Sequence, residues 1–342
     1  MATFQPRYQI SPPLLAHIKQ ITLLIHELNK RTWPEVVLAQ FQAEADAIST
    51  YASTSIEGNP LALTEVKRLL KNQPAQVRQS EREVLNYNQA LLTIREAGER
   101  PLTTPFLLEI HRLVMDGLLP VHQCGQFRRE PVIVHDPRTQ EIIYLPPDHA
   151  DVPELVAELL DFAGANQTTL DAIILAGLFH KQLVLIHPFM DGNGRTTRLA
   201  TKRLLAGLGV DTFNLFSFEN YYNRNVSRYF QQVGVLGNYY EIVRDIDYTP
   251  WLEYFAEGIL DELRRVEKQI ERHQASPDTA LQPYHRLILD YLDHQGFITD
   301  KIYATLTDRA KATRTMDFNW LIEQGYIVRL GQGRSTFYRR LN

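Results

Sequence analysis

The segment from His187 to Arg198 constrains this chain more than any other part of its sequence. It reads His-Pro-Phe-Met-Asp-Gly-Asn-Gly-Arg-Thr-Thr-Arg, and residues 170–186 before it have the length and apolar composition of a largely buried helix. Pro188 disfavours helical geometry in the preceding residue, so we expect the helix to end at His187. The Asp-Gly-Asn-Gly stretch indicates a turn, and a second helix is expected from about Gly194.

This turn combines features that suit an anion. Its glycines let backbone N–H groups converge, and the N-terminus of the second helix adds partial positive charge at the same place. Arg195 and Arg198 are three residues apart and therefore share a face of the first turn. Positive side chains are unfavourable at the partially positive N-terminus of a helix. Two arginines at this place therefore indicate an anionic partner. The alternative is an ordinary capped helix–loop–helix with solvated arginines.

At every specified position this segment resembles the signature of the Fic family, His-Pro-Phe-x-Asp-Gly-Asn-Gly-Arg-x-x-Arg. Fic proteins mostly transfer AMP from ATP to a hydroxyl side chain (Ser, Thr or Tyr) of a target protein. The resemblance implies that His187 is the general base, and an imidazole with an ordinary pKa of about 6.5 suits that work at neutral pH. Phe189 is expected to anchor the loop.

The resemblance also implies a nucleotide and metal site. Asp191 would bind Mg²⁺, or Mn²⁺, together with phosphate oxygens. Arg195 and Arg198 would hold the outer phosphates of ATP through bidentate contacts. The anion hole around the phosphates would be formed by Gly192, Asn193 and Gly194.

Gly194 bears on the type of reaction. A related branch of the family, the Doc-like phosphotransferases, has lysine at this position. The glycine therefore favours adenylyl transfer, although it leaves UMP or another nucleotide open as the transferred group.

A second motif lies in the N-terminal part of the chain. Residues 53–58 read Ser-Thr-Ser-Ile-Glu-Gly and follow a stretch with apolar residues at helical spacing. They resemble the Fic inhibitory motif, Ser/Thr-x-x-x-Glu-Gly/Asn. Ser53 and Glu57 would share a helix face, and Glu57 would pair with Arg198 and keep the γ-phosphate of ATP from it. An exposed glutamate at an ordinary helix end is the alternative.

Residues 124–147 predict a β-hairpin. Two β-rich runs, 132–134 and 142–145, flank an Asp-Pro-Arg-Thr-Gln turn. The segment resembles the Fic flap, in which Gly-x-Phe/Tyr-Arg precedes the hairpin and Pro-Pro follows it, and such a flap would bind a target by strand addition. The expected docking residues are Val132, Ile133, Val134, Ile143 and Tyr144. A purely structural hairpin is the alternative. The later segment 221–230 loosely resembles the adenine-flanking segment of the family, and its aromatic residues fit a core equally well.

Composition sets wider limits. The chain has 342 residues and a formal net charge of −4, which gives no nucleic-acid or membrane signal for the whole. Cys124 is the only cysteine, so no internal disulfide is expected and a reducing, cytoplasmic location fits. The sequence has neither a secretory signal at its start nor an apolar run long enough to cross a bilayer.

The C-terminal part predicts a separate module. The polar stretch 274–280 is the expected boundary after a charged helix that starts near Trp251. Further helices are expected near 283–294, 298–307 and 310–324, followed by a hairpin over 325–340. This order resembles a winged helix, with Lys311 near the start of the recognition helix. Residues 281–342 hold nine Lys/Arg against six Asp/Glu, a weak DNA footprint, so DNA and protein contacts both remain open.

The sequence thus predicts a mostly helical Fic protein with a β-hairpin flap. The expected parts are an N-terminal helical region with the inhibitory helix (1–100), a Fic catalytic domain (101–275) and a winged helix (281–342). The expected function is autoinhibited, Mg²⁺-dependent transfer of AMP to a target protein, including self-modification. The alternatives are a nucleotide-sensing DNA-binding regulator and an AMP-removing enzyme in which Glu57 positions water. The expected partners are ATP, a target protein, DNA through 281–342 and a second copy of the chain.

Overall fold

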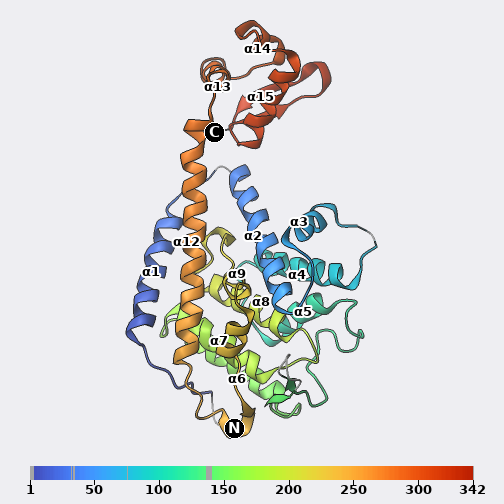
Figure 1. Ribbon diagram of the computed structural model, residues 1–342, viewed down its shortest axis with the longest axis vertical. Helices are drawn as coiled ribbons and strands as arrows, with labels where there is room; N and C mark the ends of the chain where they lie inside the picture. The colour runs from blue at the N-terminus through green and yellow to red at the C-terminus, as the bar shows by residue number, and fades with distance from the viewer. Residues whose placement is uncertain (1–3, 32, 34, 75, 136–140, 342) are drawn as a thin grey trace. The chain divides into compact units, whose positions relative to one another are not determined.

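The computed structural model describes residues 4–31, 33, 35–74, 76–135 and 141–341, and the chain forms two compact units. Unit 1 comprises Met1–Asn29 and Ala43–Arg264, and unit 2 comprises Lys30–Gln42 and Arg265–Asn342. Both units are built mainly from helices (Figure 1). The expected mostly helical fold class is therefore confirmed.

Unit 1 holds most of the elements. In chain order they are α1 (Pro12–Asn29), the later part of α2 (Glu35–Ile56), α3 (Leu63–Asn72), α4 (Gln79–Glu96), α5 (Thr104–Met115), β1 (Val134–His135), β2 (Ile142–Leu145), α6 (Val152–Ala165), α7 (Ala172–Ile186), α8 (Asn193–Gly207), the 3-10 helix η1 (Thr212–Asn214), α9 (Phe218–Asn223), α10 (Val226–Val233), β3 (Gly237–Asn238), α11 (Tyr239–Ile242) and the first part of α12 (Thr249–Ala280).

Helix α7 is the buried centre of unit 1 and packs against α6 and α8 (Figure 1). Its apolar sequence explains this position, since a helix that is hydrophobic all round belongs in a core. The helix begins after Asp171, whose Oδ1 accepts the N–H of Ile173 at 2.9 Å. It ends at Ile186, so His187 lies at its C-terminus as the following proline predicts.

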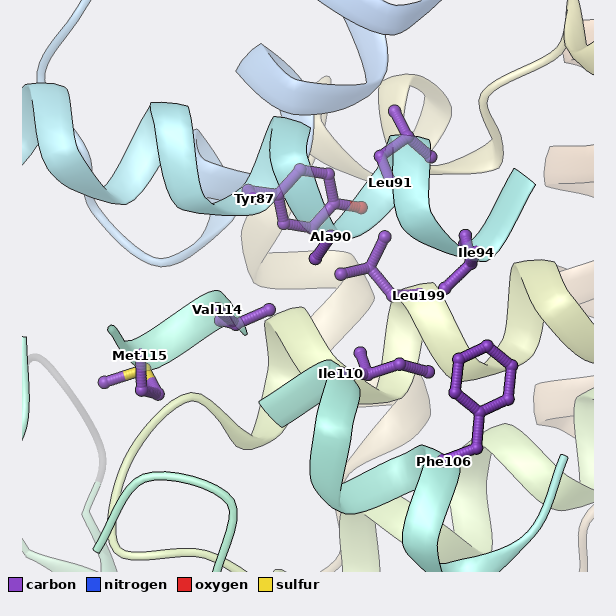
Figure 2. Close-up of a cluster of buried hydrophobic side chains, with 9 residues drawn as sticks. All are labelled: Tyr87, Ala90, Leu91, Ile94, Phe106, Ile110, Val114, Met115 and Leu199. Atoms are coloured by element: carbon purple, nitrogen blue, oxygen red, sulfur yellow. The ribbon is translucent and has the colours of Figure 1, made fainter. Parts of the chain in front are cut away.

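Side chains from α4 and α5 gather around Leu199 of α8 and fix that helix (Figure 2). Leu199 is completely buried, and its burial contributes about 1.5–3 kcal/mol relative to exposure. Because Leu199 follows Arg198 directly, this packing also fixes the first turn of α8. The buried members of the cluster are Tyr87, Ala90, Leu91, Ile94, Phe106, Ile110, Val114, Met115 and Leu199.

The expected hairpin is part of a small sheet in the order β1-β2-β3. Strand β1 pairs antiparallel with β2, with Val134 opposite Tyr144, and β2 pairs parallel with β3, with Tyr144 opposite Gly237. The first strand covers Val134–His135 and so begins later than the expected run 132–134. The expected turn at 136–140 lies outside the described residues.

Unit 2 contains the C-terminal elements α13 (Pro283–Gln295), α14 (Asp300–Leu306), α15 (Lys311–Glu323), β4 (Ile327–Leu330), the 3-10 helix η2 (Gly333–Ser335) and β5 (Phe337–Arg340). Strands β4 and β5 form an antiparallel pair. Their order agrees with the helices and hairpin expected from the sequence. The core of the unit includes Phe318 of α15, which stacks on Tyr338 of β5 with centroids 4.0 Å apart.

The division between the units differs from the expected boundaries in two respects. The stretch 274–280, the expected domain boundary, continues α12 as far as Ala280. The proline in this stretch, Pro277, is the reason to expect a boundary. A proline removes one helical hydrogen bond but does not necessarily end a helix. In addition, residues Lys30–Gln42 belong to unit 2, although they lie far from it in the sequence.

Candidate active site

His187 lies directly after α7 in a left-handed conformation (φ 50°), and its N–H donates to Leu183 O at 3.1 Å. Its Nδ1 lies 3.3 Å from Val184 O. Because a carbonyl oxygen only accepts, Nδ1 carries the proton and Nε2 keeps its lone pair. The ring is half-buried, and burial lowers the pKa of His187 below its usual value. The neutral imidazole that a general base requires is therefore favoured.

Arg128 holds the backbone of His187 and had no assigned role in the sequence analysis. Its side chain is buried, and Nε donates to His187 O at 2.8 Å. Its backbone N–H donates to Pro188 O at 2.9 Å, and its guanidinium also reaches the carbonyls of Glu130 and Pro147. Arg128 therefore joins both ends of the hairpin segment to the end of α7. The sequence signal was the Gly-x-Phe-Arg pattern before the hairpin.

Asn193 closes the signature loop with its side chain. Its Oδ1 accepts the N–H of Phe189 at 2.9 Å, and its Nδ2 donates to Phe189 O at 2.8 Å. These bonds use the side-chain oxygen and one of the two amide hydrogens, so the Asn193 side chain fixes the loop while its backbone N–H stays available to an anion. Phe189 itself is buried, in agreement with its expected role as the loop anchor.

His111 of α5 supports the same loop and is a second residue to which the sequence assigned no role, in this case without any sequence signal. Its ring stacks on Phe189 with centroids 3.8 Å apart and planes 3° apart. Nδ1 accepts the N–H of Gly125 at 2.9 Å, so Nε2 carries the proton and donates to Asp191 O at 3.1 Å. Burial lowers the pKa of His111 to about 4, so the ring is neutral at physiological pH.

The two glycines of the loop are required for different reasons. Gly192 has φ 75°, and a Cβ there would lie 2.5 Å from Met115 Sδ. At Gly194 a Cβ would lie 2.2 Å from Glu57 Oε1. Any side chain at position 194, including the lysine of the Doc-like branch, is therefore incompatible with the observed position of Glu57.

Arg198 and the motif of α2 meet at the first turn of α8. Arg198 is completely buried, and its Nε donates to Ser53 Oγ at 2.7 Å. Its Nη2 donates to Ser53 O at 2.9 Å and to Glu57 Oε1 at 2.7 Å. The structure thus brings together the three residues that the resemblance linked. Among the described residues, Arg198 Nη1 has no hydrogen-bond partner.

Charge and burial act in opposite directions on Arg198. Burial, the largest single effect, would lower its pKa, but the carboxylate of Glu57 together with Tyr229 and Tyr87 outweighs it, so the pKa is raised. His180 lies in the same interior, bonded to Thr201 Oγ1 at 3.0 Å and Tyr229 Oη at 3.1 Å, and burial lowers its pKa well below the usual range. Arg198 is therefore the permanent cation of this interior. Tyr229 is itself buried, which assigns this aromatic residue of 221–230 to the core.

Arg195 faces the loop. Its Nη2 lies 3.3 Å from Asp191 Oδ1, and its side chain is 6% exposed. Its Nε is buried without a hydrogen-bond partner in the described part of the chain. A buried guanidinium with unused donors next to a helix N-terminus suits an anion such as phosphate.

Asp191 is the carboxylate of the loop, and its side chain is 59% exposed. Its Oδ1 accepts the N–H of Gly192 at 2.5 Å, whereas Oδ2 has no partner among the residues that the structure describes. The described residues contain no group of three or more His, Cys, Asp or Glu side chains suited to a metal. One accessible carboxylate fits Mg²⁺ or Mn²⁺ that takes its other ligands from phosphates and water.

The structure corrects the expected docking residues of the flap. Tyr144 is 4% exposed, and its hydroxyl donates to Leu185 O at 2.7 Å, so it anchors the hairpin to α7 and is closed to a target. Val134 and Ile143 are half-buried against it, and Val132 is half-buried. The expected residue Ile133 is exposed, as are two that the prediction omitted, Ile142 and Leu145. In the described sheet β3 pairs only with Tyr144 and Leu145 of β2, so neither the outer edge of β1 nor the β3 side of residues 142–143 has a strand partner.

Comparisons with known proteins agree with this geometry. Residues 101–205 match the family model described as Fic/DOC family. A curated relative from Drosophila willistoni, named Protein adenylyltransferase Fic, is 32% identical over 191 residues, which cover 54% of this chain and 36% of the relative. The protein of the same name from Drosophila melanogaster is 31% identical over 191 residues.

Residues 101–205 of this chain therefore correspond to a Fic domain. The match spans about a third of the length of these curated relatives, 36% in both cases.

Solved structures extend the likeness to the fold beyond residues 101–205. A Fic family protein from Desulfovibrio desulfuricans G20 has a TM-score of 0.66 at 22% identity, with 98% of each chain covered. Fic-1 from C. elegans has a TM-score of 0.59 at 22% identity, with 76% of this chain and 73% of that chain covered. In the described part of this chain, no helix combines the length and apolar character needed to cross a bilayer.

Proposed function

We propose that this protein transfers AMP from ATP to a hydroxyl side chain of a target protein and that its own Glu57 inhibits this reaction. One observation carries the proposal: the buried guanidinium of Arg198, in the first turns of the signature helix, donates to Ser53 of α2 and to Glu57, the residue directly after α2. The names of the curated relatives support the reaction type. The glycine at position 194, where the phosphotransferase branch has lysine, supports it as well.

In the proposed reaction the target hydroxyl oxygen forms a bond to the α-phosphorus of ATP. The bond from that phosphorus to the oxygen that bridges to the β-phosphate breaks, so AMP stays on the target and pyrophosphate leaves. His187 takes the hydroxyl proton at Nε2, because its Nδ1 already donates to Val184 O. A positioned general base contributes about 10²–10⁴-fold to the rate.

The phosphates would bind at the N-terminus of α8. The backbone N–H groups of Asn193 and Gly194 and the unused Nε donor of Arg195 suit their charge, whereas the Gly192 N–H is bonded to Asp191 Oδ1. Asp191 would hold Mg²⁺ or Mn²⁺, which when bound neutralises phosphate charge. Removing the metal with a chelator should therefore abolish transfer, and Asp191→Ala should show the same loss at high metal concentration.

Inhibition follows from competition for Arg198. The Glu57 carboxylate already supplies a negative charge at 2.7 Å from Arg198 Nη2, next to the first turn of α8. A γ-phosphate would need the same guanidinium and the same space. ATP would then bind in an unproductive pose until α2 or Glu57 moves.

The test compares transfer of label from α-³²P ATP by the wild type, Glu57→Gly, Arg198→Ala and the double variant. We expect Glu57→Gly to raise both target labelling and self-modification. Arg198→Ala should not be rescued by Glu57→Gly, because the group that is freed would be absent. Ser53→Ala serves as the matched control and should have a smaller effect. Equal rates for the wild type and Glu57→Gly would contradict inhibition by this residue.

Removal of AMP from a modified protein is the second candidate. The Glu57 side chain is 27% exposed beside the anion site, where a carboxylate could orient water toward a phosphorus atom. Incubation with target that already carries AMP tests this reaction. A loss of AMP that requires Glu57 would favour the second candidate over the first.

We propose a winged helix for residues 281–342. Three of its arginines are internally paired: Arg309 with Asp317 at 2.8 Å, Arg314 with Asp300 at 2.9 Å and Arg340 with Asp293 at 3.0 Å. This pairing leaves a smaller basic surface than the sequence suggests, so the observations favour a protein contact over DNA. The single cysteine, a free thiol, supports a cytoplasmic location for the proposed reaction.

A further inference from the structure

Helix α2 belongs to both units of the molecule. It runs without interruption over Glu35–Ile56, yet its residues up to Gln42 are part of unit 2 and its residues from Ala43 onward are part of unit 1. The inhibitory residues Ser53 and Glu57 lie at its C-terminal end. One continuous element therefore connects unit 2 to the inhibitor of the proposed active site.

Unit 2 holds the N-terminal part of α2 by specific contacts. Val37 is 4% exposed, and its Cγ2 lies so close to Gly325 that a Cβ there would come within 3.3 Å. Gln40 Nε2 donates to Glu323 O at 3.0 Å. Glu323 is the last residue of α15, where carbonyls lack helical partners, so the bond satisfies a group that the helix leaves open.

Unit 1 holds the rest of α2 through polar pairs along the helix. The guanidinium of Arg95 in α4 donates to both carboxylate oxygens of Asp46. Lys67 Nζ of α3 lies 2.6 Å from Glu44 Oε1. Thr50 Oγ1 donates to Oδ1 of Asn88 in α4 at 3.3 Å. The last of these attachments is the Ser53 and Glu57 contact to Arg198, the one that ATP would displace.

We propose that unit 2 controls the proposed active site by holding the N-terminal end of α2. The inference rests on the proposed inhibition by Glu57. Helix formation is cooperative, so loosening residues 35–42 weakens the rest of the helix and lowers the fraction of molecules in which Glu57 occupies Arg198. A molecule that binds unit 2 and favours the released helix would then activate transfer, and by linkage ATP would favour its binding in return.

The test uses full-length protein with single substitutions at the unit 2 end of α2. Val37→Asp puts a charge into the buried contact, and Gln40→Ala removes only the bond to Glu323 O. Ala39→Ser, at an exposed position of the same helix segment, is the matched control. We expect Val37→Asp to raise the initial rate of AMP transfer about five-fold or more, the lower end of usual coupling between sites. Gln40→Ala should raise it less, and Ala39→Ser should leave it unchanged.

Two further measurements separate this proposal from its rivals. Helix α12 also belongs to both units, so a change in unit 2 could act without α2. In a Glu57→Gly background Val37→Asp should not raise the initial rate of AMP transfer further, because no inhibitor remains to be released. An equal rise in that background would overturn the proposal. Equal rates for the wild type and Val37→Asp would overturn it as well. Hydrogen exchange of the amides of 43–56 should become faster in Val37→Asp, with native circular dichroism retained.

This exchange measurement does not depend on activity. If Glu57→Gly transfers no nucleotide at all, the proposed function fails, while faster exchange in 43–56 would still support control of α2 by unit 2. Unchanged exchange in Val37→Asp would overturn that control whatever the activity.

Discussion

Two residues of the signature segment owe their properties to their surroundings. His187 has a fixed tautomer, because Nδ1 donates to Val184 O, and burial lowers the pKa of its ring. Gly194 owes its requirement to Glu57, whose carboxylate fills the space of a side chain there. Both effects bear on measurable properties at the scale of single residues.

The pH dependence of transfer should reflect the lowered pKa of His187. Only the neutral imidazole accepts a proton, and a lowered pKa keeps it neutral to lower pH than an ordinary histidine. In the Glu57→Gly variant we expect a rate that is constant near neutrality and falls as the pH drops through a midpoint below about 6.5. Initial rates between pH 4.5 and 8, assay values chosen to span about two units on either side of that midpoint, measure it. A midpoint above the ordinary value would contradict the effect of burial.

Replacing Gly194 by alanine should lower the free energy of unfolding of the wild type more than that of Glu57→Gly. In the wild type the added Cβ meets Glu57 Oε1 at 2.2 Å, and such overpacking costs about 1–3 kcal/mol. In Glu57→Gly the clash with Oε1 is absent and only a tight contact of 3.0 Å with Arg198 Nη1 remains, while alanine is a better helix former than glycine by up to about 1 kcal/mol. Urea denaturation of the wild type, Gly194→Ala, Glu57→Gly and the double variant measures the coupling free energy between positions 57 and 194. Equal effects in both backgrounds would mean that Glu57 does not occupy this place in solution.

At the scale of elements, the site depends on how α5, α7 and the hairpin are joined. Arg128 bonds carbonyls at the end of α7 and at both ends of the hairpin segment. Tyr144 ties β2 to α7 through Leu185 O, and His111 of α5 holds the loop at Asp191 O. These bonds to backbone carbonyls position His187 without touching a substrate.

Arg128→Lys should destabilise the protein strongly although it keeps the charge. A lysine ammonium cannot span the carbonyls that the planar guanidinium reaches, so buried acceptors lose their donors. Each bond to a charged donor is worth about 1.5–3 kcal/mol, and we expect a loss of about 3 kcal/mol or more in the free energy of unfolding. Arg129→Lys, at the exposed neighbouring position, is the control. Denaturation curves of the two variants that coincide would refute this account.

At the scale of the whole molecule, the inhibitory contact links two distant segments. Ser53 and Arg198 are separated by 145 residues, and the helix that carries Ser53 begins in unit 2. The stability of the chain should therefore respond to ATP in a way that depends on Glu57.

Mg²⁺-ATP should raise the melting temperature of Glu57→Gly more than that of the wild type. A ligand stabilises the folded state according to its affinity, and Glu57 competes with the γ-phosphate for Arg198. A tenfold gain in affinity adds about 1.4 kcal/mol at saturating ligand. ADP is the matched control, because it lacks the γ-phosphate and should shift both proteins alike. If ATP raises the melting temperatures of the wild type and Glu57→Gly equally in a thermal denaturation assay, competition at Arg198 is refuted.

The local parts of the fold follow from the sequence because their causes are local. Apolar residues predict the buried helix α7, and Pro188 predicts its end at His187. The glycines predict the turn before α8, which begins at Asn193, one residue before the expected start. The pairing of Glu57 with Arg198 came from a family resemblance that spans 141 residues of chain and did not come from a local pattern.

The tertiary structure alone decided which distant groups meet. His111 lies 80 residues from Asp191, Arg128 lies 59 from His187, and Tyr144 lies 41 from Leu185. No periodicity or turn rule reports on such separations, so the hairpin residue Tyr144 was taken for a docking residue. The division of α2 between two units has the same origin, because it depends on packing against elements nearly 300 residues later in the chain. The sequence determined the chemistry of the signature loop, and packing determined what holds it.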